Sequence, residues 1–174
     1  MNTKKLVLAG LMGALALVGT MVIQIPTAGG YIHLGDSIVY LCGILLGPFL
    51  GGAAAAVGSM LADVLSGYAN YAVPTFLIKG LDAMVVGFIY MHVLKNAETV
   101  TSKAIRYVVA FIPGGLIMVG GYAITSYFFY GIGGAIGSFG PNFVQAFVGG
   151  ALGLPLLMAL EKANVKKMIE GHNH

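Results

Sequence analysis

Several hydrogen-bonding side chains in this sequence recur at the spacing of one helical turn. Three pairs lie three or four residues apart: Lys79 with Asp82, Asn142 with Gln145, and Tyr122 with Ser126. Residues at these spacings share one face of a helix. Ammonium, carboxylate, amide and hydroxyl groups held together in this way suit the binding of a small polar molecule.

The residue patterns of common catalytic sites are missing from the sequence. There is no His-Glu-x-x-His, no Gly-x-Ser-x-Gly and no phosphate-binding Gly-x-x-x-x-Gly-Lys-Ser/Thr. The histidines lie in separate segments, at positions His33, His92, His172 and His174, and their spacing does not predict a metal site. We therefore expect no catalytic residues, no metal and no cofactor, and any coupled ATP hydrolysis would reside in partner subunits.

The segments that carry these polar residues are strongly apolar. Between Arg106 and Glu161 the chain runs for 54 residues without one Asp, Glu, Lys or Arg. A helix needs about 20 apolar residues to cross the hydrocarbon core of a bilayer, so this stretch alone predicts two crossings. The whole chain is 58% hydrophobic and 9% charged. These values predict an integral membrane protein, with the lipid bilayer as its surroundings.

The apolar runs and their Gly and Pro breakers predict the architecture. We expect an all-α protein, a compact bundle of six transmembrane helices that forms a single domain over residues 1–174. The expected spans are 6–23, 36–46, 53–66, 74–94, 104–130 and 142–160, with a loop at 27–35 and glycine-rich turns at 47–52 and 131–141. Eight of the nine basic residues then lie on one side of the membrane. The positive-inside rule places that side in the cytoplasm, so both termini are expected inside.

With this topology, most of the remaining polar groups gather at the outer end of the bundle. We predict a ligand pocket there, formed by His33, Asp36, Asp63, Asn70, Tyr71, Lys79, Tyr122, Ser126, Asn142 and Gln145. Simpler roles stay open: Lys79 could form an ion pair with Asp82, shared with Asp63, and the amides could link helices. The tyrosines could belong to the aromatic belts of the membrane interface.

The first helix carries small residues at a four-residue spacing. The pairs are Ala9 with Gly13 and Gly10 with Ala14. Small residues spaced in this way form a groove against which another helix packs closely. The groove predicts either a docking face for a partner helix or close packing within this chain.

Three segments resemble the substrate-binding S components of energy-coupling factor (ECF) vitamin transporters. These are His33-Leu-Gly-Asp-Ser-Ile-Val-Tyr-Leu-Cys-Gly-Ile-Leu-Leu-Gly-Pro-Phe-Leu-Gly-Gly52, Gly58-Ser-Met-Leu-Ala-Asp-Val-Leu-Ser-Gly-Tyr68 and Pro74-Thr-Phe-Leu-Ile-Lys-Gly80. The resemblance extends over the whole chain and implies a high-affinity vitamin-binding subunit in a bacterial plasma membrane. It also implies that helix one docks to a shared membrane coupling subunit that is driven by two ATPase subunits.

The sequence is most similar to family members that handle small rings, such as pyridoxine or the hydroxymethylpyrimidine precursor of thiamine. A riboflavin-specific S component and a stand-alone secondary transporter of a small polar solute are the alternatives. Thiamine-specific members stack their ligand on tryptophan, which this chain lacks, and metal-specific members carry an N-terminal Met-His where this chain has Asn2. With Asp82 included, the charged groups at the outer end are one Lys (Lys79) and three Asp (Asp36, Asp63 and Asp82), which disfavours phosphorylated ligands. No nucleic-acid partner is expected, because topology explains the basic residues.

Overall fold

The computed structural model describes residues 3–27 and 30–163, and nearly all of them are helical. The helices are α1 (Thr3–Val22), α2 (Asp36–Leu46), α3 (Pro48–Leu65), α4 (Ala72–His92) and α5 (Val100–Lys162), with a short 3₁₀ turn η1 (Ala69–Tyr71). Two strands, β1 (Gln24–Thr27) and β2 (Gly30–His33), join α1 to α2. The predicted helical class is confirmed and the count of six spans stays a prediction, whereas the segment expected to be a loop contains a β-hairpin.

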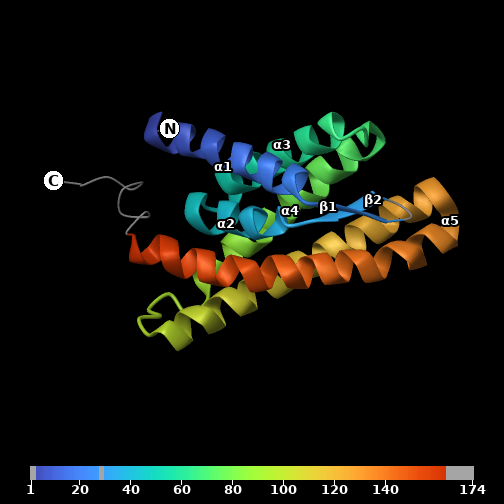
Figure 1. Cartoon of the computed structure of the whole chain (residues 1–174). Coiled ribbons are helices and arrows are strands. Elements are labelled where there is room, and N and C mark those ends of the chain that lie inside the picture. The colour runs from blue at the N-terminus through green and yellow to red at the C-terminus, as the bar shows by residue number, and fades with distance from the viewer. Residues whose placement is uncertain (1–2, 28–29, 164–174) are drawn as a thin grey trace.

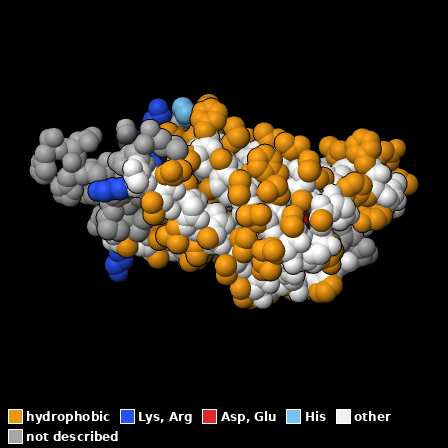
Figure 2. Space-filling view, turned by 90° about the horizontal axis from the view of Figure 1, so that it is seen from above, with side chains coloured by type: hydrophobic (Ala, Val, Ile, Leu, Met, Phe, Trp, Pro, Cys, Tyr) orange, Lys and Arg blue, Asp and Glu red, His pale blue; other side chains and the backbone are white. Residues whose placement is uncertain are grey.

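Four of the helical segments are long and apolar enough to cross a membrane: Thr3–Val22, Pro48–Leu65, Ala69–His92 and Val100–Lys162. Helix α2 is apolar but has only 11 residues. Hydrophobic side chains cover most of the face seen in Figure 2, while the Lys and Arg side chains in view gather at one end. This surface is that of a membrane protein, because only a hydrocarbon solvent tolerates so many exposed apolar groups.

Helix α5 is two helices joined at a kink. Gly131 has a φ of 71° and a ψ of −163°, a conformation outside the helical region that favours glycine. The chain reverses there, and the two arms of α5 run back alongside each other (Figure 1). We expected a turn over 131–141, but the second arm is helical directly after Gly131. Continuous helix keeps backbone groups hydrogen-bonded, which an apolar environment demands.

Local sequence sets where the other helices begin. Gly47 has a φ of 83°, and Pro48 then starts α3 at a position where its missing N–H costs nothing. The expected turn over 47–52 is therefore reduced to Gly47. Thr99 caps α5, since its Oγ1 accepts a hydrogen bond from the Ser102 N–H at 3.1 Å.

Helix α2 lies at the centre of the bundle, and nine of its eleven residues are buried. Close packing against α4 is possible because Gly43 and Gly87 face each other: a Cβ on either glycine would collide with the backbone of the other helix. Tyr40 and Leu41 of α2 are fully buried in the main hydrophobic core. The packing of α2 in the core therefore holds Asp36, the first residue of α2, in a fixed position.

The antiparallel hairpin β1–β2 pairs Gln24 with His33 and Thr27 with Gly30. It extends from the α1–α2 junction towards the bend of α5, away from the ends of α5 (Figure 1). One side chain of β1 ties it to α3, because the Gln24 amide donates to Ser66 Oγ at 2.9 Å. The hairpin thus covers the end of the bundle opposite to the basic residues.

Candidate ligand-binding site

A polar cavity lies under the hairpin. It is lined by side chains of β2, α3, η1, α4 and both arms of α5, among them Tyr31, His33, Asp63, Tyr68, Tyr71, Thr75, Tyr122, Ser126, Ser138, Asn142 and Gln145. The cavity leaves about 60 Å³ for the centres of water-sized spheres. One water needs about 15 Å³ by the same measure, so the cavity has room for a few waters.

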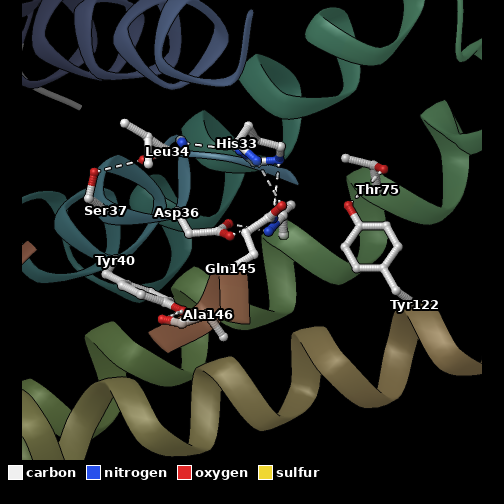
Figure 3. A network of polar contacts seen from close by, with 11 residues as sticks. His33, Leu34, Asp36, Ser37, Tyr40, Thr75, Tyr122, Gln145 and Ala146 are labelled. Carbon is white, nitrogen blue, oxygen red and sulfur yellow. Dashed lines mark hydrogen bonds and ion pairs between the residues drawn. The ribbon is translucent and has the colours of Figure 1, made fainter. Parts of the chain in front are cut away.

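Beneath the cavity, a buried ion pair connects α4 with α2. The Lys79 ammonium contacts Asp36 Oδ1, and both side chains are completely buried. Gln145 of α5 donates from Nε2 to Asp36 Oδ2 at 2.7 Å, and its Oε1 accepts the backbone N–H of His33 at 3.0 Å. Figure 3 shows His33, Asp36 and Gln145 converging from three elements. The network fixes Gln145 and His33 at the floor of the cavity.

This pairing corrects our expectation for the charged residues. An ion pair of Lys79 with Asp82, three residues along the same helix, was the alternative to a ligand contact, but Lys79 pairs with Asp36, 43 residues away. Neither carboxylate oxygen of Asp82 has a hydrogen-bond partner among the described residues. Asp63 instead accepts a hydrogen bond from the Tyr31 hydroxyl at 2.7 Å. The helical spacing placed Lys79 near Asp82, but Lys79 forms its ion pair with Asp36 of α2 instead.

His33 lies in the lining of the cavity as a neutral ring. Its Nδ1 accepts the Gly35 N–H at 3.1 Å and therefore carries no proton. Burial lowers the pKa of His33 to about 4, and the Lys79 charge acts in the same direction while Asp36 opposes it. The neutral ring then carries its proton on Nε2. His33 Nε2 lies 3.3 Å from Gln145 Nε2, so the ring is held against the floor of the cavity.

Aromatic rings form one wall of the cavity. The rings of Tyr71 and Tyr122 lie 6.5 Å apart, and Phe129 meets Tyr71 edge-on at 5.2 Å. The Tyr122 hydroxyl shares a 2.9 Å hydrogen bond with Thr75 Oγ1. The Tyr71 hydroxyl is buried and has no partner among the described residues. These rings can enclose a flat ligand and still offer it a hydroxyl group.

The two amide side chains of α5, Asn142 and Gln145, have different hydrogen-bond partners. Asn142 donates from Nδ2 to the Ser138 carbonyl at 2.8 Å, one turn back along the helix. Asn142 also lines the cavity. The Gln145 oxygen and one of its N–H groups are already occupied by His33 and Asp36. Asn142 is therefore the better candidate for a direct ligand contact, and Gln145 holds the floor in place.

Seven of the ten residues predicted for the pocket line this cavity: His33, Asp63, Tyr71, Tyr122, Ser126, Asn142 and Gln145. Asp36 and Lys79 lie beneath it as the buried ion pair, and Asn70 is exposed and outside the lining. Their roles in binding stay predictions.

The predicted set also left out several lining residues, including Tyr31, Tyr68, Thr75 and Ser138. Two of them carried a signal in the sequence. Tyr31 is two residues before His33, which places both on one face of a strand. Thr75 is four residues before Lys79 and so shares its helix face.

The expected docking face of α1 is divided in the structure. Ala9 is buried, and a Cβ on Gly13 would lie 3.1 Å from the Ala54 carbonyl oxygen of α3. This pair therefore packs within the chain. Gly10 and Ala14 are exposed, and a Cβ on Gly10 would meet nothing within 4 Å. Only the Gly10–Ala14 half of the small-residue face is free for a partner helix.

A second hollow of about 520 Å³ by the same measure lies between the two arms of α5. Its lining is almost wholly apolar and includes Val108, Ile112, Leu116 and Phe147, all of which are exposed. Without polar groups, it cannot orient a water-soluble ligand. Among the described residues, no group of three or more His, Cys, Asp or Glu side chains could hold a metal ion.

An all-helical membrane body with a polar cavity enclosed at one end defines a membrane-embedded binding protein. Over residues 1–162 the chain matches the family model of the ECF-type riboflavin transporter S component, and it belongs to this family. S components are the substrate-binding subunits of vitamin transporters and are not enzymes. The resemblance found in the sequence is thereby confirmed.

The chain is also similar to individual proteins. The thiamine precursor transporter HmpT of Lactococcus lactis subsp. cremoris (strain MG1363) is 28% identical over 167 residues, which cover 94% of this chain and 92% of the relative. An uncharacterised protein of Pyrococcus woesei is 38% identical over 135 residues, covering 75% and 85%. The solved S component of a bacterial ECF transporter has the same fold, with a TM-score of 0.68 and 21% identity over 96% of this chain and 100% of that one.

Proposed function

We propose that this protein captures a small heteroaromatic vitamin or vitamin precursor at the outer face of a bacterial plasma membrane, and that hydroxymethylpyrimidine or pyridoxine is its ligand. The observation that carries the proposal is the enclosed polar cavity, which has aromatic walls and unpaired hydrogen-bonding groups. The similarity to HmpT supports this choice of ligand.

In the proposed transporter, the protein works with a transmembrane coupling subunit and two ATPase subunits. ATP hydrolysis takes place in those partners. The exposed Gly10–Ala14 face of α1 is the docking surface for the coupling subunit, since close helix packing needs small residues. Six crossings follow if α2 and each arm of α5 count as spans, and both termini are then cytoplasmic.

We expect the purified protein to bind its ligand without ATP, with a dissociation constant well below 1 μM, which corresponds to about −8 kcal/mol. A ligand of about a dozen heavy atoms reaches such affinity only if nearly all of its polar atoms are paired. Asn142→Ala should weaken binding about tenfold or more, because a buried ligand atom loses its partner. Calorimetry with hydroxymethylpyrimidine, pyridoxine, riboflavin and thiamine provides the measurement.

Asn70→Ala is the matched control for this variant. Asn70 is exposed and outside the cavity lining, so its loss should leave the affinity unchanged. Binding of none of the four compounds would refute the proposed function. Equal affinities of the wild type and Asn142→Ala would remove Asn142 from the site.

The proposed topology makes a separate prediction about accessibility. In a Cys42→Ser background, Glu98→Cys should not react with an impermeant thiol reagent added to intact cells, because the α4–α5 connection is cytoplasmic. Gly133→Cys is the control: position 133 is exposed, next to the bend of α5 at the opposite end. It should be labelled from outside. Labelling of position 98 but not 133 would invert the topology.

A further inference from the structure

Asp63 is the only charged side chain among the described residues that line the cavity, and one of its oxygens is unused. Oδ1 accepts the Tyr31 hydroxyl at 2.7 Å, whereas Oδ2 is buried and has no hydrogen-bond partner among the described residues. The residue is only 6% exposed. A buried acceptor without a partner is costly, and a ligand that donates a hydrogen bond to it removes that cost.

The charge of the cavity follows from the same residues. No Lys or Arg lies among the described lining residues. Lys79 is close below, but it is completely buried and paired with Asp36, and His33 is neutral at physiological pH because burial lowers its pKa to about 4. The lining therefore holds no cationic partner for Asp63, and the positive charge of Lys79 acts on it only from below. Such a site repels phosphate and favours a donor or a cation.

The ligands differ in what they can present to Asp63 Oδ2. Hydroxymethylpyrimidine carries an amino group, whose N–H bonds can point at a carboxylate without a neighbouring carbonyl. The ring N–H of riboflavin is flanked by two carbonyl oxygens, which a carboxylate repels. The Tyr71 hydroxyl, which has no partner among the described residues, can donate to an acceptor nitrogen of a pyrimidine ring.

We infer that Asp63 is the residue that selects the ligand, and that it selects an amino-substituted ring, an aminopyrimidine, by accepting a hydrogen bond from its amino group at Oδ2. This inference rests on the proposed function and narrows its ligand. Tyr31 has a positioning role, since its hydroxyl occupies Oδ1 and directs Oδ2 to the ligand.

The test compares two ligands on the full-length protein by calorimetry. One is hydroxymethylpyrimidine, and the other is its analogue in which a methyl group replaces the amino group. The wild type should prefer the amino form by about tenfold to a hundredfold, the range expected for a hydrogen bond to a charged group. In Asp63→Ala this preference should vanish.

Ser66→Ala is the matched control on the same segment. It removes the hydrogen bond from Gln24 that ties the hairpin to α3 but keeps the carboxylate. Affinity for both ligands should fall together, so the preference for the amino form should persist. If Asp63→Ala does not fold, Asp63→Asn replaces it in the test. The preference for the amino form should then be smaller in Asp63→Asn than in the wild type.

Three results would overturn the inference while the proposed function stands. These are equal binding of the two ligands by the wild type, a preference that survives in Asp63→Ala, and tight binding of pyridoxine with none of hydroxymethylpyrimidine. If the wild type binds no vitamin or precursor at all, the proposed function fails and the inference fails with it.

Discussion

Replacing Lys79 by methionine should destabilise the folded protein by about 3–5 kcal/mol, the cost of stranding one partner of a buried ion pair. Lys79 and Asp36 are both completely buried, and they join α4 to α2. The methionine leaves the Asp36 carboxylate with only the Gln145 amide as a partner. The loss should therefore be one of stability, although Lys79 was expected from the sequence to contact the ligand.

Cys42 provides the measurement. It is the only cysteine of the chain and its side chain is buried in α2, so a maleimide that fluoresces on reaction reports thermal unfolding in detergent. The control is the double variant Lys79→Met with Asp36→Asn, which removes both charges and keeps an oxygen for Gln145. It should recover much of the lost stability. An unchanged unfolding midpoint together with weaker ligand binding would make Lys79 a ligand contact.

Replacing Gly10 by leucine should abolish uptake in cells that contain the coupling subunits and leave ligand affinity in detergent nearly unchanged. A Cβ on Gly10 meets nothing within 4 Å in this chain, so the larger side chain is tolerated by the fold. It would, however, fill the groove between Gly10 and Ala14 that a partner helix needs. Radiolabelled uptake and calorimetry on the same variant separate the two effects.

Gly13→Leu is the matched variant, three residues away on the same helix. Its side chain would press against the Ala54 carbonyl of α3, and overpacking of this kind costs about 1–3 kcal/mol. We therefore expect Gly13→Leu to lower the unfolding midpoint and Gly10→Leu to leave it unchanged. Wild-type uptake by Gly10→Leu would show that the coupling subunit docks elsewhere.

Much of the fold could be predicted because apolar length and Gly or Pro breakers dominate this sequence. The expected span 36–46 coincides with α2 (Asp36–Leu46). The errors lie where composition suggested turns: Pro48 begins a helix, and the glycine-rich segment after Gly131 continues one. In an apolar environment the backbone must satisfy its own hydrogen bonds. Glycines therefore interrupt a helix less readily there than they do in water.

The site was predictable in its location and less so in its internal pairing. The topology placed His33, Asp63 and Asn142 at one end, and all three line the cavity. The partner of Lys79 could not be derived, because Asp36 is 43 residues away and on another helix. The hairpin was missed as well, since two four-residue strands joined by Ala28-Gly29 carry too weak a pattern to be told from a loop.

The bend of α5 concentrates the cavity wall in one short stretch of chain. Tyr122 and Ser126 precede Gly131, and Ser138 and Asn142 follow it. Exchanging residues 122–145 between relatives would therefore replace much of the cavity wall in one step. Helix α1 and the ion pair between α2 and α4 would stay unchanged. Gln145 sets the limit of such an exchange, since its amide also holds Asp36 and His33. Ligand preference can thus change by replacement of one local stretch while α1 stays as it is.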